Sequence, residues 1–450
     1  MKFTKGEIDR LGEKIRSEKN KVSEVTLQQL QEYRTSHENS ISKIFNILCT
    51  LSNQVRKDSI VTFRIKRIDS IIRKLDRYPD MRFSRMWDIG GCRCILKNDA
   101  QVYKLMGELR NNLDVKDNIK DYIKNPQPDG YKSLHVFVSL PGDNKVIEVQ
   151  LRNQNDHNWS TLVEITDLLY DSRLKEYGEN KELLRFHYLL SQTNDLSTKH
   201  KKEIANTIKR YSYFEKLSEV FSRNYLQVRK RWVEIENLKS NKYFLILASK
   251  NEVPIIKSFS HFPEAEEAYY NDYKKLENTN IVLTHLINPN FNQINIAYSN
   301  YILTFHTFMD DALTIIENLI IESLRKRKIP AFIKFFGLYN NIIFHHIKNL
   351  LDEINAASNL TIEKYNSNTH GKRRKNNKPK LPKDWASDLE SQFRRNRDRT
   401  NGFVRSLRKN LPINGIERYL IIRTIKFISN KYTKKLEKIL AVNKVDSSKS

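Results

Sequence analysis

Apolar residues recur three and four positions apart through the first fifty residues of the chain, and polar residues separate them. This spacing places apolar side chains on one face of a helix. It predicts two amphipathic helices within residues 7–52. The positions that carry the pattern are Leu27, Leu30, Ile41, Ile44, Ile47 and Leu48.

The next hundred residues combine helical spacing with short apolar runs that are typical of strands. Two prolines and a glycine within residues 126–130 indicate a loop, and Pro141-Gly142-Asp143 indicates a hairpin turn. These signals predict helices packed on a small mixed sheet. The predicted helices are 67–75, 101–109 and 156–169, and the predicted strands are 91–96, 134–138 and 146–151.

Beyond residue 178 the pattern is mainly helical, with a long charged helix predicted over residues 201–237. Strand-like runs interrupt it and predict a second small α/β module. The module's predicted strands are 243–248, 253–256 and 280–283, and its predicted helix is 263–273. Further on we expect apolar helices over 303–358, a basic, proline-containing linker over 366–384, and helices over 385–408 and 415–441.

We therefore expect an α+β fold in which a mixed sheet is flanked by helices. Three domains are predicted. Residues 1–240 would hold the sheet with leading and trailing helices, and residues 241–302 the small α/β module. Residues 303–450 would form a basic helical C-terminal region.

Composition narrows the class of protein. The chain has 450 residues, of which 39% are hydrophobic, so it can bury a substantial core. It contains no run of 18 apolar residues and begins with no apolar signal-peptide core, so we expect no membrane span. Its three cysteines are too few for a disulfide framework, which favours a reducing cytoplasm.

The formal net charge of +26 is unevenly distributed. Residues 371–450 carry 23 Lys and Arg against 7 Asp and Glu, so 23 − 7 = +16 lies in the last 80 residues. A basic surface attracts polyanions such as nucleic acid. The alternative is a lysine-favouring composition with a solvated tail.

Several polar residues of the mixed region suit nucleotide chemistry. Basic residues around Ser70 lie at the start of a predicted helix, where anions bind. Asp88 precedes two glycines and a strand, and Glu148 interrupts an apolar strand. Two such carboxylates can hold magnesium together with phosphate oxygens. The alternatives are a turn-capping aspartate and a solvated sheet face.

Four blocks, in order along the chain, together resemble the synthetase region of RelA/SpoT proteins. The resemblance covers roughly residues 60–170. The blocks are Arg64-x-Lys66-x3-Ser70-x3-Lys74, Asp88-Ile89-x-Gly91-x-Arg93, Asp121-Tyr122-Ile123-x2-Pro126-x3-Gly130-Tyr131-x-Ser133-Leu134-His135 and Glu148-Val149-Gln150-Leu151-Arg152. No Walker A sequence is present, which disfavours a P-loop NTPase.

The resemblance implies a nucleotidyltransferase-like fold and an enzyme that moves pyrophosphate from ATP to a ribose 3′-hydroxyl. Asp88 and Glu148 would hold Mg²⁺, and Glu148 would also take the proton from the hydroxyl. The implied ATP contacts are Arg64, Lys66, Ser70, Lys74 and Arg93. The implied acceptor contacts are Tyr131, which would stack on the base, and His135, Gln150 and Arg152.

The acceptor differs between branches of this family. Tyr33-Arg34-Thr35-Ser36-His37 and the segments 85–93 and 150–164 resemble the toxic small-synthetase branch, several members of which modify the 3′-CCA end of tRNA. Gln127 stands where many alarmone synthetases carry lysine, which weakens the case for free GDP or GTP. We therefore expect tRNA as the acceptor. The alternatives are guanosine or adenosine nucleotides, or a non-catalytic RNA-binding module.

Two further features bear on regulation. Segments 243–247, 264–269 and 297–301 resemble the C-terminal domain of fused toxin–antitoxin members, which masks the active site until a phage protein releases it. A structural or oligomerisation domain is the alternative.

No His-Asp dipeptide occurs among the 11 histidines, so the hydrolase half of long RelA/SpoT proteins is not expected.

Overall fold

The computed structural model divides the chain into two compact units, which are described separately. The first unit comprises residues 1–191 and 234–304, and the second comprises residues 192–233 and 305–450. The structure describes residues 3–18, 21–170, 172, 174, 180–192, 196–220, 224–235, 240–249, 252–276, 280–286, 289–298, 306–368, 383–410, 415, 419, 422 and 423.

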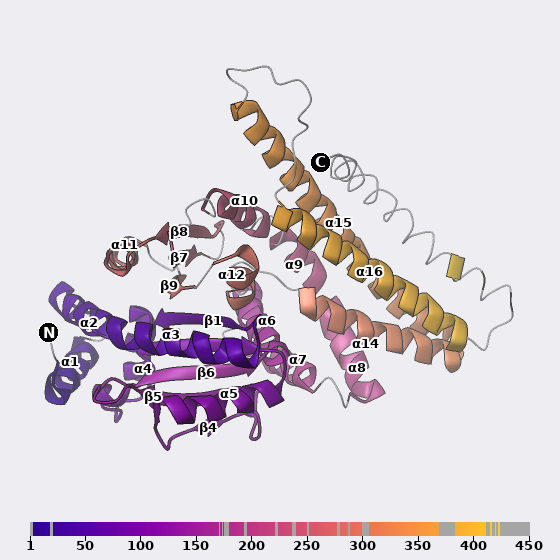
Figure 1. Cartoon of the computed structure of the whole chain (residues 1–450). Helices are drawn as coiled ribbons and strands as arrows, with labels where there is room; N and C mark the ends of the chain where they lie inside the picture. The colour runs from indigo at the N-terminus through magenta and orange to yellow at the C-terminus, as the bar shows by residue number, and fades with distance from the viewer. Residues whose placement is uncertain are drawn as a thin grey trace. The chain divides into compact units, whose positions relative to one another are not determined.

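The described part of the first unit is built on one nine-stranded sheet (Figure 1). The strand order is β3-β5-β6-β2-β1-β9-β7-β8, and β4 pairs with β5. Strands β2 and β6 are parallel and the other pairs of described strands are antiparallel, so the sheet is mixed. The strands are β1 (Ile60–Ile65), β2 (Gly90–Leu96), β3 (Asp114–Val115), β4 (Lys120–Asp121), β5 (Leu134–Ser139), β6 (Ile147–Asn153), β7 (Tyr243–Ala248), β8 (Ile255–Phe259) and β9 (Asn280–His285).

One face of this sheet forms the core. Alternation along β2 and β6 sends Cys92, Cys94, Val149 and Leu151 to that face, where all four are buried. Helices α3 (Glu38–Val55) and α5 (Asp99–Asn112) cover it and pack against each other. The apolar spacing of residues 41–48 thus supplies the cover over the central strands, and the opposite face is left for polar side chains.

The remaining helices of the first unit surround the sheet. Three helices, rather than the two predicted, occupy the N-terminal segment, because the chain breaks near Ser36 as well as near Ser23. The helices are α1 (Lys5–Glu18), α2 (Glu24–Thr35), α4 (Ile68–Arg77), η1 (Phe83–Arg85), α6 (Gln154–Tyr170), α7 (Lys181–Ser191), α11 (Phe262–Lys275) and α12 (Phe291–Ala297).

Residues 241–302 differ from the separate module that the sequence suggested. Strand β9 pairs with β1 through Phe63↔His285 and Arg64↔Thr284, so β7, β8 and β9 extend the central sheet. The Thr284 hydroxyl also donates to the Phe63 carbonyl oxygen, 2.9 Å away. The predicted boundary at residue 240 therefore falls within one sheet rather than between two folding units.

The second unit is helical in its described part. Its helices are α8 (Thr198–Arg210), α9 (Tyr213–Val220), α10 (Leu226–Ile235, of which the last two residues belong to the first unit), α14 (His306–Arg325), α15 (Ile329–Asn368) and α16 (Lys383–Asn410). The single long helix expected over 201–237 is divided, because Ser212 adopts φ 46° between α8 and α9. Buried hydrogen bonds tie the helices together, such as those from Tyr225 and Trp385 to Glu353.

The predicted fold class is confirmed: a mixed sheet is flanked by helices, and the C-terminal region is helical. Most of the predicted linker, residues 369–382, and nearly all of the predicted helix 415–441 lie outside the described residues. Among the described helices, none combines the length and the apolar character that crossing a bilayer requires.

Candidate active site

The polar face of the sheet brings together residues that are far apart in the sequence. In the parallel pair β2–β6, Gly91 lies beside Glu148 and Arg93 beside Gln150. In the antiparallel pair β5–β6, His135 lies beside Gln150. Because these positions alternate with the buried ones, the side chains of Glu148, Gln150, Arg93 and His135 leave the sheet on the side away from α3 and α5.

Asp88, two residues before β2, is held by two lysines. Lys66 Nζ lies 2.8 Å from Asp88 Oδ2, and Lys74 Nζ lies 2.9 Å from both carboxylate oxygens. Burial acts to raise the pKa of Asp88, but the two ammonium groups outweigh it and hold the pKa well below its usual value. Asp88 therefore stays ionised, and its charge is shared between α4 and the end of β1.

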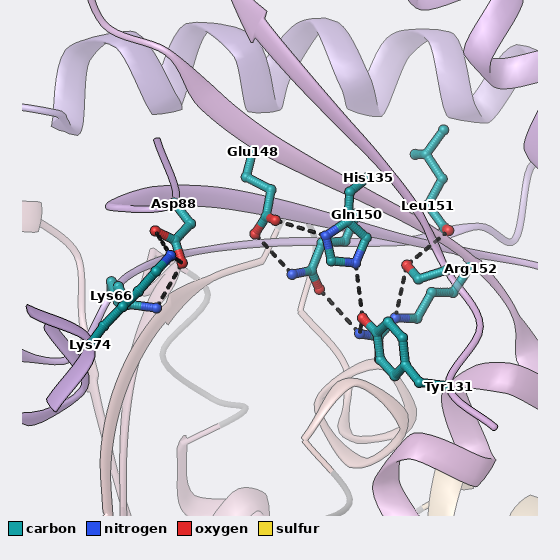
Figure 2. Close-up of polar contacts among 10 residues, drawn as sticks. Lys66, Lys74, Asp88, Tyr131, His135, Glu148, Gln150, Leu151 and Arg152 are labelled. Atoms are coloured by element: carbon teal, nitrogen blue, oxygen red, sulfur yellow. Dashed lines mark hydrogen bonds and ion pairs between the residues drawn. The ribbon is translucent and has the colours of Figure 1, made fainter. Parts of the chain in front are cut away.

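Glu148 is held by a different set of partners (Figure 2). His135 Nδ1 lies 2.8 Å from Glu148 Oε1, and Gln150 Nε2 donates to Oε2 at 2.9 Å. Burial acts to raise the pKa of Glu148, but the hydrogen bond and the charge of His135 lower it further than burial raises it. Burial lowers the pKa of His135, but its hydrogen bond to Glu148 and its interactions with Tyr131 and the Glu148 charge together outweigh burial, so that pKa is raised.

A chain of hydrogen bonds continues from His135 to Tyr131 and Arg152. The Tyr131 hydroxyl lies 2.9 Å from His135 Nε2 and accepts a hydrogen bond from Arg152 Nη2. A charged His135 donates from Nε2 to the Tyr131 hydroxyl and from Nδ1 to Glu148, whereas a neutral His135 that donates from Nδ1 accepts the Tyr131 proton at Nε2. These hydrogen bonds connect Tyr131, which is expected to stack on the nucleobase of the acceptor, to Glu148, which is expected to accept the proton of the hydroxyl.

Tyr131 is set by the backbone before it. Gly130 adopts φ +94°, a conformation that glycine takes readily and that other residues rarely adopt. A Cβ at this position would lie 2.4 Å from Ser191 Oγ. The loop therefore packs against the end of α7 as closely as a glycine permits, and this contact fixes the approach of Tyr131 to the sheet.

Both carboxylates line one pocket of about 860 Å³. In Figure 2 they leave the sheet on the same side, and the charge of Asp88 contributes to raising the pKa of Glu148. The two acidic side chains therefore interact electrostatically. Basic and aromatic residues complete much of the wall: Lys74, Arg77, Arg85, Lys120, Trp87 and Phe137.

This donor set suits Mg²⁺ bound together with a substrate. Mg²⁺ in nucleotide sites uses one or two carboxylates, and phosphate oxygens and water complete its coordination. Among the described residues, no group of three or more His, Cys, Asp and Glu could enclose a metal ion by itself. Asp88 and Glu148 would therefore share the ion with phosphates. Phosphate oxygens would also replace Asp88 as partners of Lys66 and Lys74.

The predicted ATP residues Arg64 and Arg93 form a second group on the same face. Burial, followed by the charges of Arg152 and Arg64, lowers the pKa of Arg93 to about 10. Arg93 Nη1 donates to the Ala297 carbonyl oxygen of α12 at 3.4 Å. Beside it, Nε2 of the buried His157 lies 2.6 Å from the Ile296 carbonyl oxygen. Helix α12 therefore packs against this arginine group.

The remaining predicted residue, Ser70, lies on α4, and its hydroxyl accepts a hydrogen bond from Arg67 Nε at 3.2 Å. Sequence reasoning missed three features of the site: the cover by α12, the role of Lys120 at the pocket wall, and the Trp87–Phe137 ring contact at 5.6 Å. The basic Lys120 and the aromatic Trp87 beside matched motifs were available signals. The position of α12 had no local signal.

Comparison with known proteins places this site in a family. Residues 63–174 match the model described as "Region found in RelA / SpoT proteins". We call residues 63–174 the RelA/SpoT region. It contains all eleven predicted site residues, from Arg64 to Arg152.

The relatives of the RelA/SpoT region include several curated enzymes. A GTP pyrophosphokinase of Haemophilus influenzae is 32% identical over 130 residues, which cover 29% of this chain and 17% of the relative. A GTP pyrophosphokinase of Bacillus subtilis is 31% identical over 112 residues, covering 22% of this chain and 53% of the relative. A guanosine-3′,5′-bis(diphosphate) 3′-pyrophosphohydrolase of Borreliella burgdorferi is 29% identical over 117 residues, covering 25% and 17%.

Among solved structures, the small alarmone synthetase 1 of Bacillus subtilis bound to pppGpp aligns with 22% identity and a TM-score of 0.32. The alignment covers 37% of this chain and 90% of that one. The chain thus spans about half the length of one curated relative and about a sixth of the others named above.

Proposed function

We propose that this chain is an ATP-dependent pyrophosphokinase that transfers the β,γ-pyrophosphate of ATP to a ribose 3′-hydroxyl. The observation that carries the proposal is the pair of ionised carboxylates, Asp88 and Glu148, on one face of the sheet and in one pocket. The names of the pyrophosphokinase relatives support the same reaction.

In this reaction Glu148 removes the proton of the 3′-hydroxyl as its oxygen attacks the β-phosphorus of ATP. The bond between the β-phosphorus and the α,β-bridging oxygen breaks, and AMP leaves with that oxygen. The products are AMP and the 3′-pyrophosphorylated acceptor. His135 and Gln150 orient the two oxygens of Glu148, so that the carboxylate is directed before the acceptor arrives.

The two lysines that contact Asp88 would bind ATP, the donor of the pyrophosphate. Lys66 and Lys74 would exchange part of their interaction with Asp88 for the phosphates of ATP, since an ammonium group has three donors. Arg64, Arg93 and Ser70 are the proposed partners of the nucleotide and its phosphates. Mg²⁺ held by Asp88 and Glu148 would neutralise charge on the transferred group and on the leaving oxygen.

We favour the 3′-CCA end of tRNA as the acceptor. Gln127 contributes no cation to the loop before Tyr131, where the 5′-phosphates of a free nucleotide would need partners. An RNA carries its own phosphates away from the reacting end and can be held by distant basic surface. Modification of the terminal ribose would block aminoacylation, and the modified tRNA could not take part in translation. The enzyme would then act in the cytoplasm as a translation-inhibiting toxin, for example in phage defence.

A free guanosine or adenosine nucleotide is the second candidate acceptor. The specific observation in its favour is that two of the relatives named above are GTP pyrophosphokinases. Lys120 at the pocket wall could meet a nucleotide phosphate. If neither acceptor reacted, a non-catalytic RNA-binding module would account better for the chain.

The acceptor experiment incubates the full chain with γ-³²P-ATP and, separately, with tRNA, GDP, GTP or AMP. A further arm uses tRNA whose terminal ribose diol has been destroyed by periodate oxidation. Label on intact tRNA and none on the oxidised tRNA supports the favoured acceptor. Label in a guanosine or adenosine nucleotide, with none on tRNA, would replace it by an alarmone synthetase.

We also propose that residues 241–302 regulate this site. The support is the position of α12, whose last carbonyl groups contact Arg93 and His157, so that nucleotide binding by Arg93 competes with α12. A phage protein that withdraws α12 would then activate the enzyme. An Ile294→Asp variant, which places a charge at a fully buried position of α12, should raise the affinity for ATP.

The matched control for this variant is Ile256→Asp, which buries the same charge in β8. It should leave the affinity for ATP unchanged, because β8 lies at the far end of the strand order from β2. An equal rise in both variants would indicate general loosening of residues 241–302. No rise with Ile294→Asp would contradict the regulatory role.

A further inference from the structure

Helix α16 of the second unit has a composition that the proposed reaction does not explain. Residues 394–409 contain six arginines and one lysine, against a single acidic residue. In the whole chain lysine outnumbers arginine, 48 to 31. In this helix arginine therefore outnumbers lysine, the opposite of the ratio in the whole chain. Arginine is the side chain that binds phosphate with two parallel hydrogen bonds.

Five of the six arginines lie on the exposed side of α16, and we call them the arginine face. They are Arg394, Arg395, Arg397, Arg405 and Arg408. At 3.6 residues per turn, four of them fall within about 80° of one another around the helix, with Arg395 beside them. The buried residues of the helix, Leu389, Phe393, Phe403 and Leu407 among them, lie on the other side.

The sixth arginine shows what a structural arginine looks like in this helix. Arg399 donates to Asp310 Oδ1 at 3.0 Å and to the Thr314 hydroxyl at 2.7 Å, and so joins α16 to α14. By contrast, Arg394 and Arg397 make exposed contacts within their own helix, with Glu390 at 2.7 Å and Asp398 at 3.3 Å. Exposed pairs of this kind are weak and exchange readily for a phosphate.

A second group of cations lies where α15 begins. Helices α15 and α16 are antiparallel, since Tyr339 packs on Phe403 and Glu353 accepts from Trp385. This alignment puts Arg405 and Arg408 beside the first turns of α15. The turn that leads into α15 is Arg325-Lys326-Arg327-Lys328, and all four residues are exposed. We call these four residues the basic turn.

The basic turn places an arginine where glycine fits best. Arg327 adopts φ 51°, and the bonds Lys328 N→Ser323 O (2.8 Å) and Arg327 N→Leu324 O (3.0 Å) form the usual glycine-type end of a helix. A left-handed conformation is unfavourable for any side chain with a Cβ. The end of α14 thus keeps a cation at a strained position, although a glycine would close the helix without strain.

Helix α8 adds further positive charge beside the basic turn. Thr198 donates to Glu322 Oε2 at 2.7 Å, and the charge of Lys202, after the closer Lys326 and Thr198, helps to lower the pKa of Glu322. Lys334 Nζ donates to Asn206 Oδ1 at 2.8 Å. The basic turn is therefore flanked by exposed lysines from α8 and α15.

We propose that the arginine face and the basic turn bind the phosphate backbone of RNA. From Arg394 to Arg408 the face extends over about 21 Å at 1.5 Å per residue. A DNA duplex carries one charge per about 1.7 Å of its axis, so a duplex of this length carries about a dozen phosphates, more than the arginines need. The choice of RNA as the polyanion rests on the proposed function, in which the acceptor is an RNA.

An anionic membrane is the other polyanion that a basic helix can meet. A helix that lies in a membrane interface inserts an exposed apolar face between the lipids. In α16 the apolar side is buried against α14 and α15, and the exposed side is formed by arginines. The exposed chemistry of the helix therefore fits phosphate groups in solution better than a lipid surface.

The test compares two quadruple variants in a Glu148→Gln background, in which no transfer is expected during the binding measurement. The first is Arg394→Gln, Arg397→Gln, Arg405→Gln and Arg408→Gln. The control is Arg10→Gln, Lys14→Gln, Lys104→Gln and Arg110→Gln, which removes the same charge from exposed positions of α1 and α5. Affinity for bulk tRNA is measured against salt concentration without ATP, and binding to vesicles of 30% phosphatidylserine is measured in parallel.

The arginine-face variant should lose at least tenfold in affinity for tRNA at 150 mM salt. The slope of log K against log salt should fall by about 3, since each lost phosphate contact removes about 0.7–0.9. The control should change affinity by less than twofold. Equal losses in the two variants, or a loss of vesicle binding with tRNA binding intact, would overturn the assignment.

This outcome is separate from that of the proposed function, because binding is measured without ATP. If the wild-type chain labels tRNA, and the arginine-face variant made with Glu148 intact labels it equally well at limiting tRNA, the assignment of this surface fails and the proposed reaction is unaffected. If the variant loses tRNA binding and the wild type labels only free nucleotides, the surface stands and the proposed acceptor fails. Circular dichroism and thermal melting confirm that both variants are folded.

Discussion

Asp88 and Glu148 are both ionised, but for different reasons. Two ammonium groups hold the charge of Asp88, whereas an imidazole and an amide hold that of Glu148. The first set is suited to exchange with phosphates, which bind ammonium groups. The second set is suited to orient a base, since each donor fixes one oxygen of the carboxylate and His135 loses its charge as pH rises. The chemistry of the partners therefore supports separate roles for the two acids.

The pair of His135 and Glu148 predicts a pH dependence of the reaction. The pKa of His135 is raised above 6.5, so the stabilisation from its charged bond to Glu148 is complete below pH 6.5 and is lost as pH rises through the folded-state pKa. A neutral His135 also withdraws less charge from Glu148. The rate of label transfer should therefore rise with pH above 6.5.

His135→Gln keeps a neutral donor beside Glu148 but removes the ionisation. Its rate profile should be flat between pH 6 and 8.5, with a maximal rate within about tenfold of the wild type. A wild-type profile that is already flat in this range, or an ascending limb that persists in the variant, would show that His135 does not govern the base.

The lysines on Asp88 predict an effect on stability. The pKa of Asp88 is depressed, so its contribution to stability is present above the unfolded value of about 3.9 and is lost as pH falls. Asp88→Asn leaves two clustered ammonium groups without their carboxylate. We expect a loss of about 1–3 kcal/mol at pH 7, measured by urea unfolding. A variant as stable as the wild type at pH 7 would indicate that the lysines are satisfied by solvent.

At the scale of elements, the loop before β5 sets the acceptor side of the site. Gly130 and Gly142 both adopt positive φ, of 94° and 74°. An added Cβ would meet Ser191 at Gly130, and it would meet nothing within 4 Å at Gly142. An alanine would be strained by the positive φ at either position, but only at Gly130 would it also clash with α7. Comparing the two substitutions therefore distinguishes backbone strain from the contact with α7.

Gly130→Ala should displace the loop and Tyr131 with it. We expect at least a tenfold rise in KM for the acceptor with an unchanged affinity for ATP, because Lys66 and Lys74 lie on other elements. Gly142→Ala is the matched control and should react at the wild-type rate. Equal effects in steady-state assays of the two variants would mean that strain alone, rather than the contact with α7, is responsible.

Local patterns predicted most elements of the RelA/SpoT region but not all. The alternation of Val61, Phe63 and Ile65 is a local signal for β1, but the predicted strands do not include it, because Arg64 and Lys66 interrupt the apolar run. The acidic pair was predicted because both residues lie in recognisable motifs. The bonds from Lys66 and Lys74 to Asp88 were not, since side-chain pairing across a helix and a strand has no local pattern.

At the scale of the whole molecule, the sheet crosses the boundary that the sequence suggested. Strand β9 reaches β1 across about 220 positions, and no periodicity within either segment encodes such a pairing. The consequence is that residues 241–298 complete the sheet of the RelA/SpoT region. If residues 241–298 regulate the site as proposed, their dissociation would expose the edge of β1. Movement of α12 alone would activate the enzyme at a lower cost in free energy.

Thr284→Pro tests this continuity. Proline removes an amide from β9, and the change also removes the hydroxyl bond to Phe63. Hydrogen exchange of the β1 amides should become faster by at least tenfold, and the whole first unit should unfold at a lower urea concentration. Unchanged protection of β1, with faster exchange confined to residues 241–298, would instead support an independent module.

The measurement that tests the central claim most directly follows both transferred phosphates. The full chain is incubated with acceptor and ATP labelled either at the β- or at the γ-phosphorus, and AMP is quantified. Equal transfer of both labels, one AMP per acceptor modified, and a loss of at least a thousandfold in Asp88→Asn and Glu148→Gln are predicted. Transfer of the γ-label alone, or transfer that persists in the double variant, would contradict the account.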